Sequence, residues 1–427
     1  MLKDNNPEKS IKNVGMTDRD APKARPNEIK TGNLQKRPGG EVIERQSTPE
    51  KEVVRIRTGV DRMFLITVLL LVCFGSVMVF SAGYVYSGTE YGDNFYLIKR
   101  QLGFVFIGTL AMLFAMRMNY NVYKVGARAA YAAAIVLLLL VIAIGSVGGG
   151  AQRWLVIPGI GISFQPSEIA KLAIVLMLAW YMSAYSEKIT DYGNFKKSFL
   201  YGIVFPFALL GAICVLVVLE KHFSGLVIIA VIGIVVMFVG GSRFRWLALI
   251  GVAAAVVVVV LILSTGYSLD RVTSWLDPEA NYLDGGWQTV NGMNAIGSGG
   301  LFGVGLGNSR LKYGYVSMPH NDFIFTIVCE ELGYVGALAV IALFAILIWR
   351  GFVIAMKAPD IFSSLTVIGI ISKVAIQMIL NIAVVTNLIP NTGISLPFFS
   401  YGGTALLILM FEMGIVLSIS KHSYQKK

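Results

Sequence analysis

The residue best placed to do chemistry is Asp322, the acid of the string Pro319-His320-Asn321-Asp322-Phe323-Ile324-Phe325, where a polar segment meets a long apolar run. A carboxylate at such a boundary can act as a general base that takes a proton from a substrate hydroxyl group. It can equally be a helix N-cap, which accepts backbone N–H bonds, contributes about 1 kcal/mol and lowers the pKa of the carboxyl group. Spacing alone leaves both interpretations open.

Glu330 and Glu331 lie further along the same apolar run, about 12–13 Å from Asp322 at a rise of 1.5 Å per residue. Helical geometry places them roughly 80° and 180° round from Asp322, so neither lies directly beneath it. An acid at membrane depth costs roughly 2.5–3.5 kcal/mol, so such residues normally have partners. We predict that one of the two pairs with a buried base; a proton relay is the alternative.

Two bases also lie in apolar surroundings. Lys171 follows Glu168 by three residues, so on a helix the two side chains share a face and can pair. Lys373 lies in the middle of another apolar run, with Gln377 one turn further on. Charge pairing within the protein is one interpretation. The other is a polar cavity, open to the outer leaflet, in which these groups contact a substrate.

Membrane-spanning helices must position these residues. Hydrophobic residues make up 56% of the chain and charged residues 14%, with a mean hydropathy of +0.69, which is typical of a polytopic membrane protein. Apolar segments of about 18–25 residues, the length that a ~30 Å hydrocarbon core requires, occur ten times. They are residues 63–84, 100–118, 126–146, 167–186, 199–219, 224–241, 246–266, 323–350, 361–386 and 401–420. The expected fold is all-α, with about ten transmembrane helices.

The distribution of charge predicts the orientation. Basic residues gather beside alternate apolar segments, as in Arg117 to Arg128, Lys188 to Lys197, Arg243 to Arg245 and Lys421 to Lys427. The positive-inside rule makes that side cytoplasmic, so both termini are expected in the cytoplasm. The same rule accounts for the net charge of +11, and no nucleic-acid partner is predicted.

Four segments complete the organisation. Residues 1–60 are too polar to bury a core and are expected to form a disordered cytoplasmic tail. Residues 61–421 form the transmembrane domain, and 422–427 a cytoplasmic C-terminus. Residues 267–322, rich in glycine and aromatic residues, form a long external loop between helices seven and eight, which suits a re-entrant or interfacial segment. The three cysteines lie in apolar runs and the three histidines are scattered, which excludes a disulfide framework or a His/Cys metal site.

Four separate motifs, in order, resemble the SEDS family (shape, elongation, division and sporulation). They are Gln165–Lys171, Gly297–Gly307, His320–Gly336 and Pro390–Gly403. The resemblance covers residues 60–421 and favours the FtsW-like branch over the RodA-like branch, on Gln377, Asn381 and residues 384–386. The string 220–225 departs from the family pattern, so no role is carried over to it.

The resemblance implies that the protein polymerises the lipid-linked disaccharide precursor of peptidoglycan (lipid II) on the outer face of the bacterial cytoplasmic membrane. Asp322 matches the essential aspartate of the family, so it would be the base of an inverting glycosyl transfer. Glu168 and Lys171 fall in a family motif. Candidate bases for the substrate diphosphate are the external Arg100, Arg153, Arg271, Arg310 and Lys312 and the buried Lys373, since arginine matches phosphate oxygens bidentately.

The resemblance further implies a divalent cation, Mg²⁺ or Mn²⁺, and no organic cofactor. Expected partners are a class B penicillin-binding transpeptidase and other division proteins. Small residues in the eighth span, Gly333, Gly336, Ala337 and Ala339, would permit a partner helix to approach closely. Two alternatives stay open: a lipid II flippase, in which the buried charges line a translocation path, and a non-catalytic scaffold for the transpeptidase.

Overall fold

The computed structural model describes residues 55–57, 59–148, 151–157, 162–191, 193–252 and 272–426. Eight helices in this part of the chain are long and apolar enough to cross a membrane. They are α1 (Arg62–Tyr91), α2 (Tyr96–Arg117), α3 (Tyr120–Ile144), α4 (Pro166–Ala184), the continuous run Phe195–Leu219, α12 (Ile324–Met356), α13 (Ile361–Val385) and α14 (Gly403–His422). The chain is therefore a multi-pass, predominantly α-helical membrane protein.

The run Phe195–Leu219 consists of α6 (Phe195–Phe199), a π-helical turn η1 (Leu200–Val204) and α7 (Phe205–Leu219). A further apolar helix, α8 (Phe223–Val239), has 17 residues. The predicted span 246–266 is helical over 244–252, and its remainder lies outside the described residues. The other nine predicted spans coincide with helices. The predicted tail 1–60 lies almost entirely outside the described part.

Several helix ends follow from local chemistry. Asp61 caps α1 by accepting a hydrogen bond from the amide of Phe64 at 2.9 Å, and Asp360 caps α13 through the amide of Ser363 at 2.9 Å. Such caps satisfy amides that the first helical turn leaves without partners. Gly92 ends α1 in the left-handed region, with φ of 69°, where glycine meets no steric penalty.

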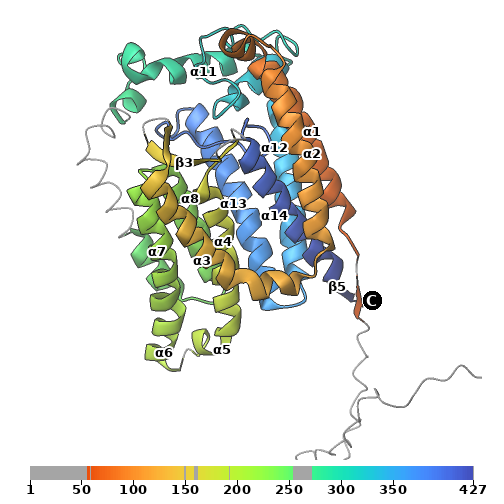
Figure 1. Ribbon diagram of the computed structural model, residues 1–427, viewed down its shortest axis with the longest axis vertical. Coiled ribbons are helices and arrows are strands. Elements are labelled where there is room, and N and C mark those ends of the chain that lie inside the picture. Colours follow the sequence, from red (N-terminus) through yellow and green to blue (C-terminus); the bar gives the residue numbers. More distant parts are fainter. Residues whose placement is uncertain are drawn as a thin grey trace, which may run out of the picture. The chain divides into compact units, whose positions relative to one another are not determined.

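The bundle has two ends (Figure 1). At the tail end, β1 (Arg55–Arg57) pairs with β5 (Tyr424–Lys426), and α5 (Ser186–Ile189) and α6 lie at the same end, on the opposite side of the bundle. At the loop end lie α11 (Trp287–Ser298), preceded by the π-helical turn η2 (Tyr282–Gly286), and residues 299–323. These two names are used below.

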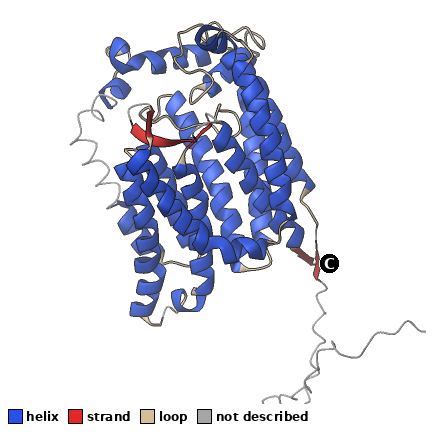
Figure 2. Ribbon diagram, viewed as in Figure 1, coloured by secondary structure: helices blue, strands red, loops and turns tan. Residues whose placement is uncertain are grey.

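The loop end also carries a small antiparallel sheet that the all-α prediction did not contain. Its strands β2 (Ser146–Gly148), β3 (Ala151–Ile157) and β4 (Ile162–Phe164) are joined in that order (Figure 2). β2 and β4, with three residues each, are too short to show an alternation, and the seven residues of β3 do not alternate between apolar and polar types. The correction is local, since the described transmembrane elements are helical.

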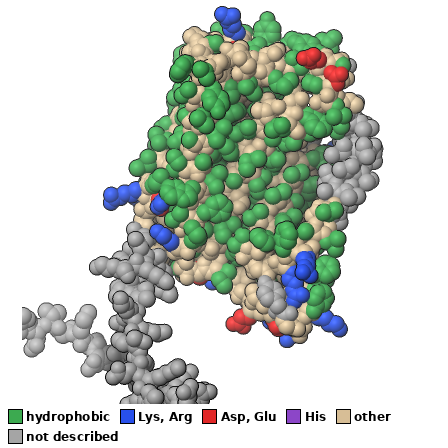
Figure 3. Space-filling view, turned by 180° about the vertical axis from the view of Figure 1, so that it is seen from behind, with side chains coloured by type: hydrophobic (Ala, Val, Ile, Leu, Met, Phe, Trp, Pro, Cys, Tyr) green, Lys and Arg blue, Asp and Glu red, His purple; other side chains and the backbone are tan. Residues whose placement is uncertain are grey.

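Helices α4, α13 and α14 form the centre of the bundle, because about two-thirds or more of each one's most apolar stretch is buried inside the protein. Only 22% is buried for α2 and α3, whose apolar side chains face outward. On the face drawn in Figure 3, hydrophobic side chains cover the flank and most charged ones lie toward the ends. The charged residues inside the bundle are therefore exceptions that need partners.

Candidate functional site

Asp322 lies half-buried at the loop end, in the turn that leads into α12. The N-cap position of this helix is occupied by Phe323, and no side chain makes a capping hydrogen bond there. Asp322 therefore lies one residue before the N-cap of α12. A chemical role for its carboxylate remains a prediction.

One hydrogen bond holds the backbone of Asp322 in place, and Gly393 lies beside its carboxylate. The side-chain amide of Asn381, fully buried near the end of α13, donates to the carbonyl oxygens of both Asp322 and Ile394 at 2.7 Å. Gly393 has φ of 66°, and a Cβ added to it would lie 3.7 Å from Oδ2 of Asp322. Asn381 thus joins three segments, and the non-helical stretch 386–402 forms one wall beside the carboxylate.

The second half of the segment 386–402 is largely buried by the protein, whereas Leu388 and Gly393 are exposed. Ile394, Leu396, Phe398 and Phe399 are at most 4% exposed. The amide of Tyr401 donates to the carbonyl of His320 at 2.8 Å. Non-helical backbone at membrane depth requires such internal partners. This segment and the turn before α12 are therefore fixed to each other.

His320, two residues before Asp322, is 3% exposed, and its ring lies 4.6 Å from that of Tyr86. Burial lowers the pKa of His320 to about 4. The imidazole is therefore neutral at pH 7 and places no positive charge beside Asp322.

A second polar group is centred on α4. Nζ of Lys171 lies 2.6 Å from Oε1 of Glu168, as the spacing predicted, and 12% of the Glu168 side chain is exposed. Just before this pair, Nδ1 of His222 lies 3.1 Å from Oγ of Ser167 and 3.3 Å from Nε2 of Gln165. Because an amide nitrogen can only donate, Nδ1 is the acceptor and the ring proton is on Nε2.

A second ion pair lies deeper than Glu168 and Lys171, in the middle of the bundle. Nζ of Lys373 in α13 lies 2.8 and 2.7 Å from the two carboxylate oxygens of Glu412 in α14. Both side chains are at most 3% exposed. Lys373 also acts electrostatically on Glu168 and on Lys171. Two acids and two bases therefore balance one another across α4, α13 and α14.

The turn between α7 and α8 joins the two polar groups, although no role was predicted for it. His222 contacts the start of α4, and Oγ of Ser224 donates to the carbonyl of Thr392, next to Gly393. Burial, followed by the nearby charges of Lys171 and of Arg153 in β3, lowers the pKa of His222 to about 4. Only a structure could reveal this link, since the string 220–225 departs from the family pattern.

A third polar group fixes the loop on α12. Nζ of Lys312 lies 3.0 Å from Oε1 of Glu331, and Oγ of Ser81 in α1 donates to the same carboxylate at 2.6–2.7 Å. Oε2 of Glu330 accepts from the hydroxyl of Ser309 at 2.5 Å. The prediction that one of the two glutamates pairs with a buried base is confirmed for Glu331.

The backbone completes this anchor, because α12 is kinked at Gly333, where φ is 67° and ψ is −166°. The amides of Val304 and Gly305 donate to the carbonyls of Glu330 and Glu331, both at 3.0 Å. Beyond the kink, the amide of Tyr334 donates to the carbonyl of Gly300 at 2.9 Å. The glycine-rich loop thus supplies the partners that the interrupted helix lacks.

The candidate diphosphate-binding residues separate into distinct environments. Lys312 is 4% exposed, and its ammonium also donates to the carbonyl of Gly307 at 2.6 Å, so its contacts favour a structural role over the predicted contact with substrate. Arg310 is exposed at the loop end, and its amide is held by Glu330 at 2.8 Å. Arg100 donates to the hydroxyl of Tyr96 at 3.0 Å. Arg271 lies outside the described residues.

The donor atoms near Asp322 do not make a metal site of protein ligands. Within the described ranges, no three His, Cys, Asp or Glu side chains form a group that could hold an ion. The divalent cation implied by the family resemblance therefore stays a prediction, with no set of ligands assigned to it. The described residues can instead supply a carboxylate base, a partly exposed ion pair and an exposed arginine, all toward the loop end.

Comparison with known proteins identifies the family to which this chain is related. A model of the FtsW/RodA/SpoVE family, described as "Cell cycle protein", matches residues 61–425. "Stage V sporulation protein E" of Bacillus subtilis is 39% identical, over 86% of this chain and 98% of its own length. A "Probable peptidoglycan glycosyltransferase FtsW" of a Geobacter species is 34% identical, over 85% of this chain and 97% of its own.

The fold is also shared with a solved structure. A chain of the structure described as "Structural coordination of polymerization and crosslinking by a peptidoglycan synthase complex" aligns with a TM-score of 0.69 and 26% identity. The alignment covers 85% of this chain and 98% of the other. The curated relatives carry the names of the division and sporulation branch, as Gln377 and Asn381 predicted.

Proposed function

This chain belongs to the SEDS family of FtsW/RodA/SpoVE cell cycle proteins, and from that premise we propose that it is a peptidoglycan glycosyltransferase. Its substrate is lipid II, which it polymerises into glycan strands in division or sporulation. The observation that carries the proposal is Asp322, a half-buried carboxylate in the turn before α12 whose backbone carbonyl accepts a hydrogen bond from Asn381. The names of the FtsW relatives support the reaction class.

In the proposed mechanism, Asp322 takes the proton from the 4-hydroxyl group of the acceptor sugar. The hydroxyl oxygen forms a bond to the anomeric carbon of the donor, the bond from that carbon to the diphosphate breaks, and the configuration inverts. The lipid diphosphate leaves with the bonding electron pair, and cationic side chains stabilise its charge. Arg310 and Arg153 are the described bases at the loop end that suit this role, and Glu168–Lys171 contacts a sugar or phosphate group.

The same proposal fixes the orientation. The loop end faces the outside of the cytoplasmic membrane, so both termini lie in the cytoplasm, as the charge bias predicts. The polyprenyl chain of the substrate then stays in the outer leaflet while its sugars reach Asp322. With α8 and the predicted span 246–266 counted, the domain would have the ten transmembrane helices that the sequence predicts.

We also propose a class B penicillin-binding transpeptidase as partner, since the similar solved structure is a complex of polymerisation and crosslinking. The predicted contact face needs one correction. Gly333 and Ala337 are buried within the chain, where Gly333 packs against residues 301–303. Ala339 is exposed and Gly336 half-buried, so the available face of α12 runs through these two residues.

A lipid II flippase is the second candidate, because Lys373 and Glu412 lie in the middle of their helices. Purified protein incubated with lipid II in vesicles separates the candidates. The wild type should form glycan chains, and Asp322→Asn, which keeps the size of the side chain, should lower the rate by about 10²–10⁴. Asp93→Asn, at an exposed acid of the α1–α2 turn, is the matched control.

Glycan formation by Asp322→Asn at the rate of the control, with equal thermal stability, would end the assignment of the base. Transbilayer movement of lipid II by the wild type without any polymer would make the protein a flippase. If the protein carried out neither reaction but still bound the transpeptidase, it would be a scaffold.

A further inference from the structure

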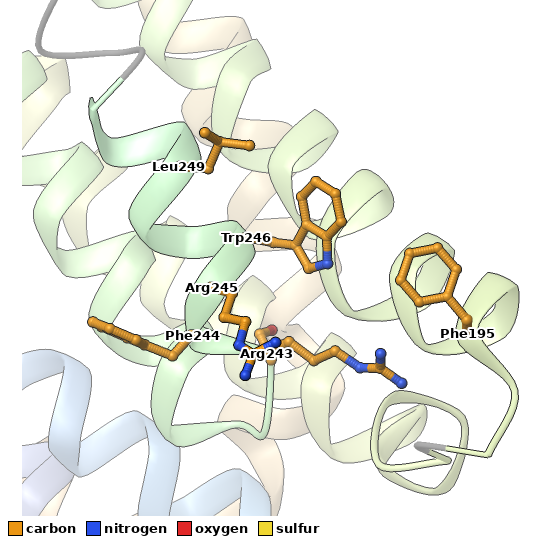
Figure 4. Close-up of a pocket in the computed structure, with 7 residues that line it drawn as sticks. Phe195, Arg243, Phe244, Arg245, Trp246 and Leu249 are labelled. Carbon is orange, nitrogen blue, oxygen red and sulfur yellow. The ribbon is translucent and has the colours of Figure 1, made fainter.

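A pocket opens at the tail end, at the opposite end of the bundle from Asp322. It has a volume of about 800 Å³ and is lined by Phe195 of α6, residues 242–246 and Leu249 (Figure 4). Two of the lining residues, Arg243 and Arg245, are cationic, and none is acidic. The exposed Lys196 and Lys197 follow Phe195 directly. The pocket is therefore suited to an anion.

The pocket is built on a fixed turn. Oγ of Ser242, 6% exposed, donates to the carbonyl of Gly202 at 2.6 Å, and Gly241 adopts a positive φ of 98°. These features hold the α8 end against η1, so Arg243 and Arg245 start from a defined backbone. Two guanidinium groups that extend from such a fixed backbone can bind phosphate oxygens with charge-assisted hydrogen bonds.

The rest of the lining is aromatic and aliphatic. The guanidinium of Arg243 lies 5.3 Å from the ring centre of Phe195, toward which it extends in Figure 4, and the ring of Trp246 lies 4.9 Å from that of Phe199. Phe244 and Leu249 are 66% and 59% exposed. A soluble anion gains no free energy by contacting this apolar surface, whereas the acyl chains of a lipid can pack against it. Tryptophan beside bases is also typical of the membrane–water boundary.

We propose that this pocket binds a phospholipid with an anionic headgroup, with the phosphate at Arg243 and Arg245 and the acyl chains along Phe244 and Leu249. Charge complementarity and position identify this occupant. The pocket lies at the first residues of the membrane-spanning run Phe195–Leu219, on the side where basic residues gather. Basic pockets between helix ends on that side recognise anionic lipid headgroups. The proposal is independent of the reaction at Asp322.

Native mass spectrometry of the full-length protein in detergent tests the proposal. The protein is titrated with phosphatidylglycerol or with phosphatidylcholine of the same acyl chains, and inorganic phosphate is added as a competitor. We expect tighter retention of phosphatidylglycerol, without displacement by phosphate at the same concentration. The double variant Arg243→Gln/Arg245→Gln should weaken that retention by about tenfold or more.

The matched control is Arg117→Gln/Lys421→Gln, which removes two exposed bases of the tail end outside the pocket and should bind like the wild type. If the double variant melts early, Arg245→Gln alone, at an exposed residue, should still weaken retention several-fold. Equal retention of the two lipids by the wild type, or an equal loss in pocket and control variants, would overturn the proposal. Displacement by phosphate would overturn it in favour of a soluble anion.

Discussion

Replacing Lys312 by Met tests whether a buried ion pair holds the loop on α12. Methionine keeps an unbranched apolar stem but removes the ammonium that donates to Glu331 at 3.0 Å and to the carbonyl of Gly307 at 2.6 Å. The Glu331 side chain is fully buried. In the variant it keeps the hydroxyl of Ser81 and the amide of Ser309 as donors, but its charge loses the neutralising base.

Breaking a buried ion pair by removing one partner costs about 3–5 kcal/mol, because the remaining charge stays buried without compensation. That is a large share of a typical total stability of about 5–15 kcal/mol. The double variant Lys312→Met/Glu331→Gln removes that uncompensated charge, and glutamine can still accept from Ser81. The double variant should therefore be more stable than Lys312→Met alone, by about 1–3 kcal/mol.

The assay is unfolding of the purified proteins in one detergent, with Lys99→Met as the matched control. Lys99 pairs with Asp93 at 2.8 Å, but the two side chains are 69% and 40% exposed, so its loss should cost at most about 1 kcal/mol. If Lys312→Met and Lys99→Met were equally stable, or if the double variant were the least stable, the ion pair would not be the anchor of the loop.

Three further predictions each concern a single residue. Gly333→Ala should strongly destabilise the protein, because the new Cβ would lie 2.3 Å from the amide nitrogen of Gly303 at a φ of +67°, whereas Gly211→Ala, with no atom within 4 Å, should be neutral in the same unfolding assay. Burial raises the pKa of Glu220 to about 8, so the folded state holds a proton that the unfolded state releases near pH 4.5. The stability of the protein should therefore fall as pH rises through about 4.5–8. The fall in melting temperature from pH 5 to 8.5 should be smaller for Glu220→Gln than for the wild type. Ala339→Trp on the exposed face of α12 should abolish co-purification with the transpeptidase, while Ala133→Trp, exposed on α3, should leave it intact; equal recovery of the partner would exclude this face.

The sequence predicted well whatever depends on neighbours along one helix. Apolar length located the spans, and the three-residue spacing of Glu168 and Lys171 predicted their pair, which is 2.6 Å apart. Both features need only the geometry of a single helix. The N-cap alternative for Asp322 could not be settled in this way, because one residue of offset at the start of α12 decides it.

Contacts between distant segments were beyond the sequence. The base that pairs with Glu331 lies in the loop, at Lys312, which its position had assigned to substrate binding. The kink at Gly333 is hidden in a continuous apolar run, since glycine within a helix pattern does not by itself indicate a break. Asn381 marked a family branch in the sequence, but its two hydrogen bonds to Asp322 and Ile394 depend on how three segments meet.

The depth at which charged residues occur in the bundle helps to distinguish a polymerase from a flippase. In the central helices the innermost charged residues are Lys373 and Glu412, and the next charged residue of α14 is Lys421 in its last turn. From there toward the tail end, the described residues 172–184 of α4, 361–372 of α13 and 413–420 of α14 contain no Asp, Glu, Lys or Arg. A carrier of a charged diphosphate needs polar groups along the whole path. A polymerase needs them only where the sugars and the diphosphate meet the base, the role proposed for Asp322, and both Asp322 and the Glu168–Lys171 pair lie toward the loop end.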